Sequence, residues 1–453
     1  MISTLRSFTF SLGICHHLAV ALAVLTIGAW ILAPKPVQAM DIQVVKSTSG
    51  VEAWLVEERS VPLIAMRIAF DGGSAQDPDD KAGLANFLST MLDEGAGSLD
   101  AATFQRLLEE NAVKLSFSDS RDHFSVSLQT LTENRAKAIE LLKLALTQPR
   151  FDADAVERMR KQLLSRLAFD AKNPNRVAGK VWAEKTFAGH PYARPSRGTP
   201  ESVKSIQAAD LEGYRKRVFA RDTVKVAVVG DIDAATLKTL LDEVFGDLPE
   251  RADLKPIPKA KLKTGLQTVI KMPVPQSVAV FGLPGIARKD KDFMAAFVLN
   301  QILGGGGFAS RLMNEVREKR GLAYSVYSYL QTLDGAAILA GGVATKNERV
   351  AESLKVIRSE LKRMADDGPT EKELANAKSY LTGSYALRFD TSSKIAQQLL
   401  GIQLEDLGLS YVDTRNKQIE AVTIEDIRRV AKRLLDIDAL NVTVVGQPDG
   451  LPG

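Results

Sequence analysis

The side chains that most often carry enzyme chemistry are scarce in this 453-residue chain. It contains one cysteine, Cys15, and four histidines, of which His123 and His190 are the two that follow residue 39. They stand 67 positions apart, so no pair of histidines one helical turn apart can bind zinc. Neither a G-x-x-x-x-G-K-[ST] nor a G-x-S-x-G motif occurs. The sequence therefore argues against an autonomous zinc peptidase, a P-loop ATPase and an ordinary serine hydrolase.

A second group of candidates lies in residues 304–325, which read GGGGFASRLMNEVREKRGLAYS. Arg317 and Tyr324 are seven positions apart in this segment, and both can donate hydrogen bonds to a carbonyl oxygen or an oxyanion. The alternative is a charged helix end next to an aromatic strand residue. The glycines are Gly304, Gly305, Gly306 and Gly307. Such a run permits positive φ and close backbone approach, as in a tight turn into the following helix.

The first 39 residues differ from the rest of the chain. Arg6 is the one charged residue before Lys35, and residues 18–33 form an almost unbroken apolar run. This run is shorter than the roughly 20 residues of a membrane span, and the small residues Val37 and Ala39 suit signal peptidase. We predict a signal peptide, residues 1–39, cleaved after Ala39, and export to a periplasm or the extracellular space. A retained N-terminal membrane anchor is the alternative.

The remaining residues have the composition of a globular protein. Apolar residues make up 45% of the chain and charged residues 25%, which is enough apolar material for large cores. The 59 basic and 55 acidic side chains give a net charge of +4. This near balance offers no electrostatic reason to expect nucleic acid, or a membrane surface after signal cleavage, as a partner.

An internal repeat divides the chain in two. Asp210 aligns with Asp426 and Gly230 with Gly446 at one ungapped offset of 216, each within a helix-turn-strand pattern. The proline-rich and charged residues 249–263 have the character of a surface linker. We predict two homologous halves, the N-terminal half (residues 40–248) and the C-terminal half (residues 264–453), joined by this linker.

Each half shows blocks of helices and strands without strict alternation. Apolar runs and alternating residues predict strands over 63–70, 124–128, 278–282, 322–329 and 336–344. Helical periodicity predicts helices over 81–93, 134–146, 153–168, 291–303 and 347–366. Such blocks indicate the α+β class, with α/β layers and an antiparallel sheet in each half.

Three segments together resemble the pitrilysin/insulinase family of metallopeptidases, which includes the mitochondrial processing peptidases. Residues 83–95, GLANFLSTMLDEG, resemble the family's G-L-A-H-x-x-E-H-M helix, and residues 190–199, HPYARPSRGT, resemble its H-P-Y…G-T segment. Residues 304–325 resemble its C-terminal motif. The resemblance covers residues 42–448 and implies that the two halves form a clam-like chamber.

The family's inverted zinc motif is missing from this chain. The positions of its two histidines and its glutamate base are occupied by Asn86, Ser89 and Thr90, whose neutral groups are poor zinc ligands. The family's third ligand is a glutamate on a later helix, and Glu157 lies in that neighbourhood, where it is otherwise an exposed helix-start acid. We therefore expect no metal or other cofactor in this chain. Whether Glu157 or His190 has a role is left open.

The same resemblance implies roles for the C-terminal motif. Arg317 and Tyr324 would reach across to the zinc half and stabilise the substrate carbonyl in trans, and residues 304–307 would bind substrate. Retention of this motif without the zinc motif predicts a non-catalytic, substrate-binding subunit of an exported heteromeric zinc metallopeptidase. A homologous subunit with the zinc motif would be the partner and hold the zinc, and peptides would be the substrates. The alternative is a peptide-binding or structural protein with no proteolytic role, as the family's respiratory-complex core subunits illustrate.

Overall fold

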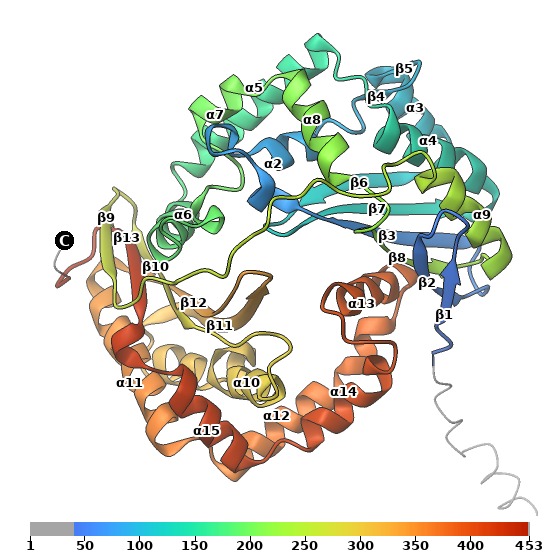
Figure 1. The fold of residues 1–453 in the computed structure, drawn as a ribbon. Helices are drawn as coiled ribbons and strands as arrows, with labels where there is room; N and C mark the ends of the chain where they lie inside the picture. Colours follow the sequence, from blue (N-terminus) through green and yellow to red (C-terminus); the bar gives the residue numbers. More distant parts are fainter. Residues whose placement is uncertain (1–39, 452–453) are drawn as a thin grey trace, which may run out of the picture. The chain divides into compact units, whose positions relative to one another are not determined.

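Two β-sheets organise the chain in this computed structural model, which describes residues 40–451 (Figure 1). The predicted signal peptide lies outside the described residues. The first sheet has the order β1-β2-β8-β3-β7-β6 and the second the order β11-β12-β10-β13-β9. The strands of the first are β1 (Gln43–Lys46), β2 (Glu52–Glu57), β3 (Leu63–Asp71), β6 (Lys114–Asp119), β7 (His123–Leu131) and β8 (Lys225–Gly230). Those of the second are β9 (Gln267–Lys271), β10 (Gln276–Pro284), β11 (Ala323–Leu333), β12 (Ala336–Lys346) and β13 (Asn441–Gly446).

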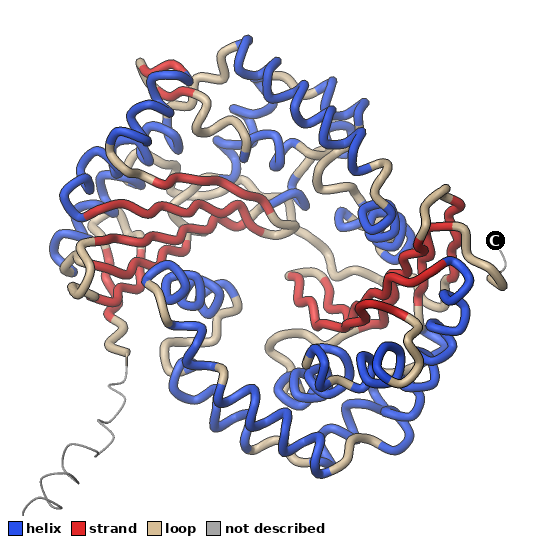
Figure 2. The backbone as a smooth tube through the Cα atoms, turned by 180° about the vertical axis from the view of Figure 1, so that it is seen from behind, coloured by secondary structure: helices blue, strands red, loops and turns tan. Residues whose placement is uncertain are grey.

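Helices cover both sheets, as Figure 2 shows with helices in blue and strands in red. In the N-terminal half they are α2 (Leu84–Ser89), α3 (Ala101–Glu110), α4 (Arg135–Thr147), α5 (Ala153–Asp170), α6 (Pro174–Thr186), α7 (Pro200–Ser205), α8 (Ala208–Val218) and α9 (Ala234–Phe245). In the C-terminal half they are α10 (Phe293–Asn300), α11 (Val350–Asp367), α12 (Glu371–Gly383), α13 (Ser392–Leu404), α14 (Tyr411–Glu420) and α15 (Ile424–Leu434). A short ribbon pairs β4 (Gly95–Ala96) with β5 (Leu99–Asp100). Among the described residues, none of the helices combines the length and apolar character that a membrane crossing requires.

The two sheets repeat one pairing pattern. β8 runs parallel to β2 and antiparallel to β3, just as β13 runs parallel to β9 and antiparallel to β10. The series β3-β7-β6 and β10-β12-β11 then continue antiparallel in both halves. The predicted fold class, α+β with two homologous halves, is therefore confirmed.

The repeated helices α8 and α15 begin in the same way. The Asp210 carboxylate accepts the Gln207 backbone N–H at 2.7 Å, and that of Asp426 accepts the Thr423 N–H at 3.0 Å. Each aspartate stands at the third helical position and closes a capping box, which satisfies backbone donors at the helix start. The 216-residue repeat thus preserves a helix start signal.

The repeated strands β8 and β13 both end in a glycine with positive φ. Gly230 has φ 146° and Gly446 φ 154°. A Cβ on Gly230 would lie 2.0 Å from the Leu63 carbonyl oxygen, and one on Gly446 2.7 Å from the Ser277 Cα. The neighbouring strand passes too close for any other residue, so both halves keep glycine here.

Helix α13 of the C-terminal half packs on the sheet of the N-terminal half (Figure 1). Its Leu399 and Leu400 are buried in one cluster with Trp54 and Val229. The Gln403 side-chain amide donates to the Val226 carbonyl at 2.9 Å. The C-terminal half therefore supplies the apolar cover for one face of the other half's sheet.

Helix α6 of the N-terminal half packs in the same way on the sheet of the C-terminal half. It packs on β10 and β13, where Ala178 clusters with buried valines of the sheet. A Cβ on Gly282 would lie 2.5 Å from the Trp182 ring, so the glycine in β10 makes room for this indole. Each half thus covers the sheet of the other with one helix, in an exchange that sequence periodicity cannot reveal.

This exchange predicts a large effect of truncating α13. Leu399→Ala should lower the free energy of unfolding by about 2–5 kcal/mol, because it removes a fully buried side chain between the halves. Leu387→Ala, at a side chain that is 69% exposed, is the matched control and should change it little. Urea unfolding measures both. Equal stability of the two variants would contradict the packing of α13 on the first sheet.

Candidate functional site

The zinc-motif positions lie on α2 (Asn86 and Ser89) and at its C-cap (Thr90), and α2 is shorter than the helix predicted over residues 81–93. The Asp77 carboxylate stabilises the start of α2. It accepts hydrogen bonds from the backbone N–H groups of Gly83 at 2.8 Å and Ala85 at 3.0 Å. Burial raises the pKa of Asp77 to about 8, against the effect of those two hydrogen bonds. Gly83 stands in the left-handed region with φ 91°, so the regular helix begins after it.

The side chains at these positions bond to neighbours within the protein. Ser89 Oγ donates to the Asn86 carbonyl, and Thr90 Oγ1 donates to the Phe87 carbonyl, both at 2.8 Å. The Asn86 amide nitrogen donates to Asp119 Oδ1 at 2.9 Å. Burial raises the pKa of Asp119, which disfavours its charge. The hydroxyl groups of Ser89 and Thr90 donate to backbone carbonyls, and Asn86 offers a neutral amide. These groups are not the histidine, cysteine or carboxylate ligands that zinc prefers.

Glu157, the candidate third ligand, lies on α5 beside Arg160. Their side chains approach to 3.1 Å between Glu157 Oε1 and Arg160 Nε, and the Glu157 side chain is 51% exposed. Within residues 40–451, no group of three or more His, Cys, Asp or Glu side chains is placed to hold a metal ion. Glu157 therefore has the surroundings of a surface ion pair.

The two remaining histidines make structural contacts. His123 Nε2 lies 3.7 Å from Asp71 Oδ1 on the neighbouring strand. His190 Nδ1 accepts the Tyr192 N–H at 3.2 Å, and Nε2 lies 2.8 Å from the Pro258 carbonyl oxygen, to which it would donate in the matching tautomer. His190 thus ties the H-P-Y segment to the linker.

Tyr192 joins the two halves, a role that the sequence did not indicate. Its hydroxyl donates to Asp122 Oδ1 at 2.5 Å and accepts the Gly335 backbone N–H at 2.9 Å. Gly335 lies in the turn between β11 and β12, so this contact holds one end of that hairpin. Burial and the Asp122 hydrogen bond raise the pKa of Tyr192, which therefore stays protonated.

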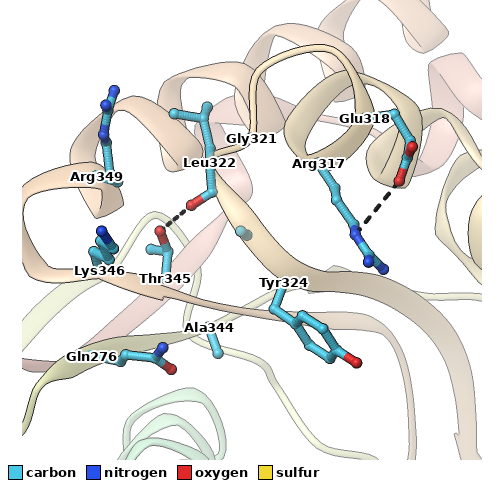
Figure 3. A pocket seen from close by; sticks show the side chains of 11 residues that line it. Gln276, Arg317, Glu318, Gly321, Leu322, Tyr324, Ala344, Thr345, Lys346 and Arg349 are labelled. Carbon is cyan, nitrogen blue, oxygen red and sulfur yellow. Dashed lines mark hydrogen bonds and ion pairs between the residues drawn. The ribbon is translucent and has the colours of Figure 1, made fainter.

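Arg317 and Tyr324 lie together on the surface (Figure 3). The Arg317 Cζ is 4.9 Å from the centre of the Tyr324 ring and 4.7 Å from that of Phe308. Tyr324 is 79% exposed and Phe308 65%. Arg317 Nε also lies 3.5 Å from Glu318 Oε1. The guanidinium group is thus held by two rings at the edge of an open pocket of about 530 Å³.

A β-bulge accounts for the exposure of Tyr324. The register between β11 and β12 shifts between Ala323 and Ser325, so Tyr324 has no partner residue on β12. Bulges at sheet edges commonly redirect a side chain in this way. The Thr345 hydroxyl donates to the Leu322 carbonyl beside the bulge and ties the entry of β11 to β12.

Glu315 secures the turn that carries Arg317. The buried carboxylate contacts Lys319 Nζ at 2.7 Å and Arg320 NH1 at 2.6 Å, and Arg363 of α11 lies 3.6 Å away. Burial by itself would raise the pKa of Glu315, but hydrogen bonds from these cations lower it to about 2. The Arg363 contact thereby links the single helical turn Met313–Glu318 to α11.

The glycines of residues 304–307 allow close backbone packing at some positions and a turn at another. A Cβ on Gly304 would lie 2.6 Å from the Ser328 backbone nitrogen, so this residue packs directly against β11. A Cβ on Gly306 would lie 2.7 Å from the Gln301 carbonyl oxygen. Gly307 has φ 56° and open space around it, as a turn requires. Their contact with substrate stays a prediction.

Comparison with known proteins assigns the family. Residues 55–200 match the family described as insulinase (peptidase family M16), and residues 205–381 match its peptidase M16 inactive domain. Together the two matches span more than two thirds of the chain. The chain belongs to the insulinase family, peptidase family M16. The resemblance found in the sequence is confirmed, and the chain is a member without the zinc motif.

Individual members of the M16 family align over most of their length. A Helicobacter pylori protein named non-peptidase homolog YmxG is 28% identical over 86% of this chain and 90% of its own. An uncharacterized zinc protease of Mycobacterium bovis is 29% identical over 80% and 84%. The crystal structure of a peptidase M16 inactive domain from Pseudomonas fluorescens is 29% identical, with a TM-score of 0.86 over 91% of this chain and 99% of that chain. The match to the inactive domain and the similarity to the non-peptidase homolog support a non-catalytic role for this family member.

The site chemistry predicts the metal content of the purified protein. After dialysis, elemental analysis should find well below one zinc per chain, and Glu157→Ala should leave that value unchanged, because the motif positions offer no imidazole or carboxylate. A tightly held zinc that is lost in Glu157→Ala would contradict this expectation.

Glu315 predicts a distinct pH dependence of stability. Its folded pKa of about 2 lies below the ordinary value of 4.5, so its stabilisation is present above pH 4.5 and is lost as the pH falls toward 2. Glu315→Gln should cost about 1.5–3 kcal/mol at pH 7, and much less at pH 3. Urea unfolding of both proteins at each pH measures the difference. A difference that does not change with pH would contradict the assignment.

Proposed function

We propose that this chain is the non-catalytic, substrate-binding subunit of an exported heteromeric zinc metallopeptidase that cleaves peptides. One observation carries the proposal. Tyr324 is exposed and the partly buried Arg317 lies beside it at the edge of a pocket, whereas Asn86, Ser89 and Thr90 bond within their own half.

The arrangement of the pair suits recognition of a peptide carbonyl. The rings of Phe308 and Tyr324 fix the plane of the Arg317 guanidinium while leaving N–H groups at its edge. A planar fork and a neighbouring phenol can donate to the same oxygen, and such donors act most strongly where negative charge develops. The 79% exposure of Tyr324 supports a role toward another molecule, because within residues 40–451 no hydrogen bond engages its hydroxyl.

The glycine segment adjoins the same pair. Gly307 precedes Phe308, whose ring lies over Arg317. Positive φ and open space at Gly307 let this backbone turn near the pocket without a side chain in the way. Residues 304–307 can therefore border a peptide bound at the pair.

The loss of the zinc motif supports a zinc-bearing partner subunit. A peptidase complex needs a metal site, and the residues at the motif positions here do not fit zinc. A homologous subunit that carries the zinc motif would supply it, since the repeat of this fold already places two similar halves in one molecule. The predicted signal peptide, residues 1–39, supports assembly of the complex in an exported compartment.

The proposal predicts the effects of two conservative substitutions on the reconstituted complex. Tyr324→Phe should lower peptide turnover by about 10²–10³-fold, the usual cost of losing one oxyanion donor. Arg317→Lys should also be harmful, because a point ammonium cannot replace a planar fork. Steady-state cleavage of a peptide measures both, and assembly should be unchanged.

Matched substitutions elsewhere control for general damage. Tyr380→Phe removes a hydroxyl from a tyrosine that is 62% exposed on α12, and Arg166→Lys alters an exposed arginine on α5. Both should retain full turnover. Full activity of Tyr324→Phe and Arg317→Lys as well would show that the chain only scaffolds its partner.

A further inference from the structure

A second pocket, of about 300 Å³, lies toward the other end of β11 from Tyr324. The strand contributes Tyr329, Leu330 and Thr332 to its wall, and helices α10, α13 and α14 and the turn Tyr385–Phe389 complete it. Its aromatic side chains are Phe293, Phe297, Tyr329, Tyr385 and Tyr411. We refer to it as the aromatic–arginine pocket. Its volume is at the lower end for ligand sites, which suits one residue rather than a long segment.

Two arginines of this pocket have no acidic partner among the described residues. The Arg288 Cζ lies 4.2 Å from the centre of the Phe293 ring and 5.1 Å from that of Tyr411. Stacking against both rings holds the guanidinium group and leaves its N–H edge for another acceptor. Arg388 is exposed at the rim.

The other charged groups of the pocket are already engaged. Arg415 is buried and donates to the Leu381 carbonyl at 3.1 Å and to Asn416 Oδ1 at 2.9 Å. Glu405, the one acid among the described lining residues, accepts the Thr332 hydroxyl at 2.9 Å. Three arginines against one glutamate leave the pocket positive, and Arg288 and Arg388 are free to bind an anion.

A row of tyrosines connects this pocket to the Arg317–Tyr324 pair. Tyr327 and Tyr329 are 49% and 44% exposed, and their rings stack with centres 6.2 Å apart. β11 is an edge strand in the described sheet, with β12 as its one neighbour, so a peptide can add along its free side. The five residue steps from Tyr324 to Tyr329 span roughly 17 Å of strand.

We propose that the aromatic–arginine pocket binds an aromatic residue of the peptide together with an adjoining carboxylate, five to eight residues from the carbonyl held by Arg317 and Tyr324. The rings of the pocket receive the aromatic side chain, and the Arg288 fork receives the carboxylate as a bidentate acceptor. The inference rests on the proposed function in taking a peptide to lie along β11. The carboxylate is either the peptide's C-terminus or an acidic side chain, since both present the same two oxygens.

Binding of three labelled peptides to the purified chain tests this inference. They share one sequence and differ at the end: a terminal Phe with a free carboxylate, the same Phe as an amide, and an amidated Phe-Asp end. Fluorescence anisotropy should show that at least one carboxylate-bearing peptide binds roughly tenfold more tightly than the amide without Asp. Tighter binding of the free acid assigns the C-terminus, and tighter binding of the Phe-Asp peptide assigns the side chain.

Variants of the chain locate the effect. Arg288→Gln should abolish the preference for a carboxylate, and Arg388→Gln should reduce it. The second variant alters an exposed side chain and keeps the test valid where loss of the stacked Arg288 weakens folding. Arg166→Gln, at an exposed arginine on α5, is the control and should keep the full preference.

Two results would overturn the inference: equal affinity for all three peptides, or no measurable binding of any of them. A preference that survives in both Arg288→Gln and Arg388→Gln would overturn it as well. Failure of the proposed function is separate, because it would appear as absent cleavage by the reconstituted pair while the carboxylate preference of the isolated chain persists.

Discussion

The exchange of helices between the halves is the interaction on which the rest of this structure depends. α13 covers the first sheet and α6 covers the second, so each half leaves an apolar sheet face that the other half must bury. Truncation of either half would expose a large apolar surface. The N-terminal half, which lacks the family's zinc motif, therefore still has a structural role, because it completes the fold of the half that carries Arg317 and Tyr324.

Strand β11 contributes residues to both proposed binding sites, and contacts at both of its ends hold it in place. At one end the bulge before Ser325 and the Glu315 ion pairs fix the turn that bears Arg317. At the other end the Tyr192 hydroxyl binds the hairpin turn at Gly335. The N-terminal half therefore helps to set the position of a peptide-binding edge in the C-terminal half. An exposed row of tyrosines on a strand fixed in this way is a surface suited to an extended partner.

The sequence predicted those features that have local causes. The 216-residue offset identified the start of α15 and the end of β13, because a capping aspartate and a strand-end glycine are local requirements. The loss of the zinc motif and the position of Arg317 and Tyr324 in the C-terminal motif could be read from the sequence, whereas the exposure of Tyr324 could not, because it depends on the bulge in β11. The helix exchange, the Tyr192–Asp122 contact and the aromatic–arginine pocket could not be predicted, because each joins residues far apart in the chain. The short α2 also escaped prediction, since apolar periodicity continues past its end at Ser89.

If this chain touches the substrate at Tyr324 while another subunit holds the metal, a photoreactive group at position 324 should react with the substrate. Replacing Tyr324 with a photoreactive p-benzoylphenylalanine and irradiating the reconstituted pair with a bound, uncleaved peptide tests this contact directly. We expect a covalent cross-link between this chain and the peptide that depends on the zinc-bearing partner. The same probe at Tyr380, an exposed tyrosine on α12, should give none. Equal labelling from both positions, or no cross-link from position 324 in an assembled complex that binds the peptide, would contradict this expectation.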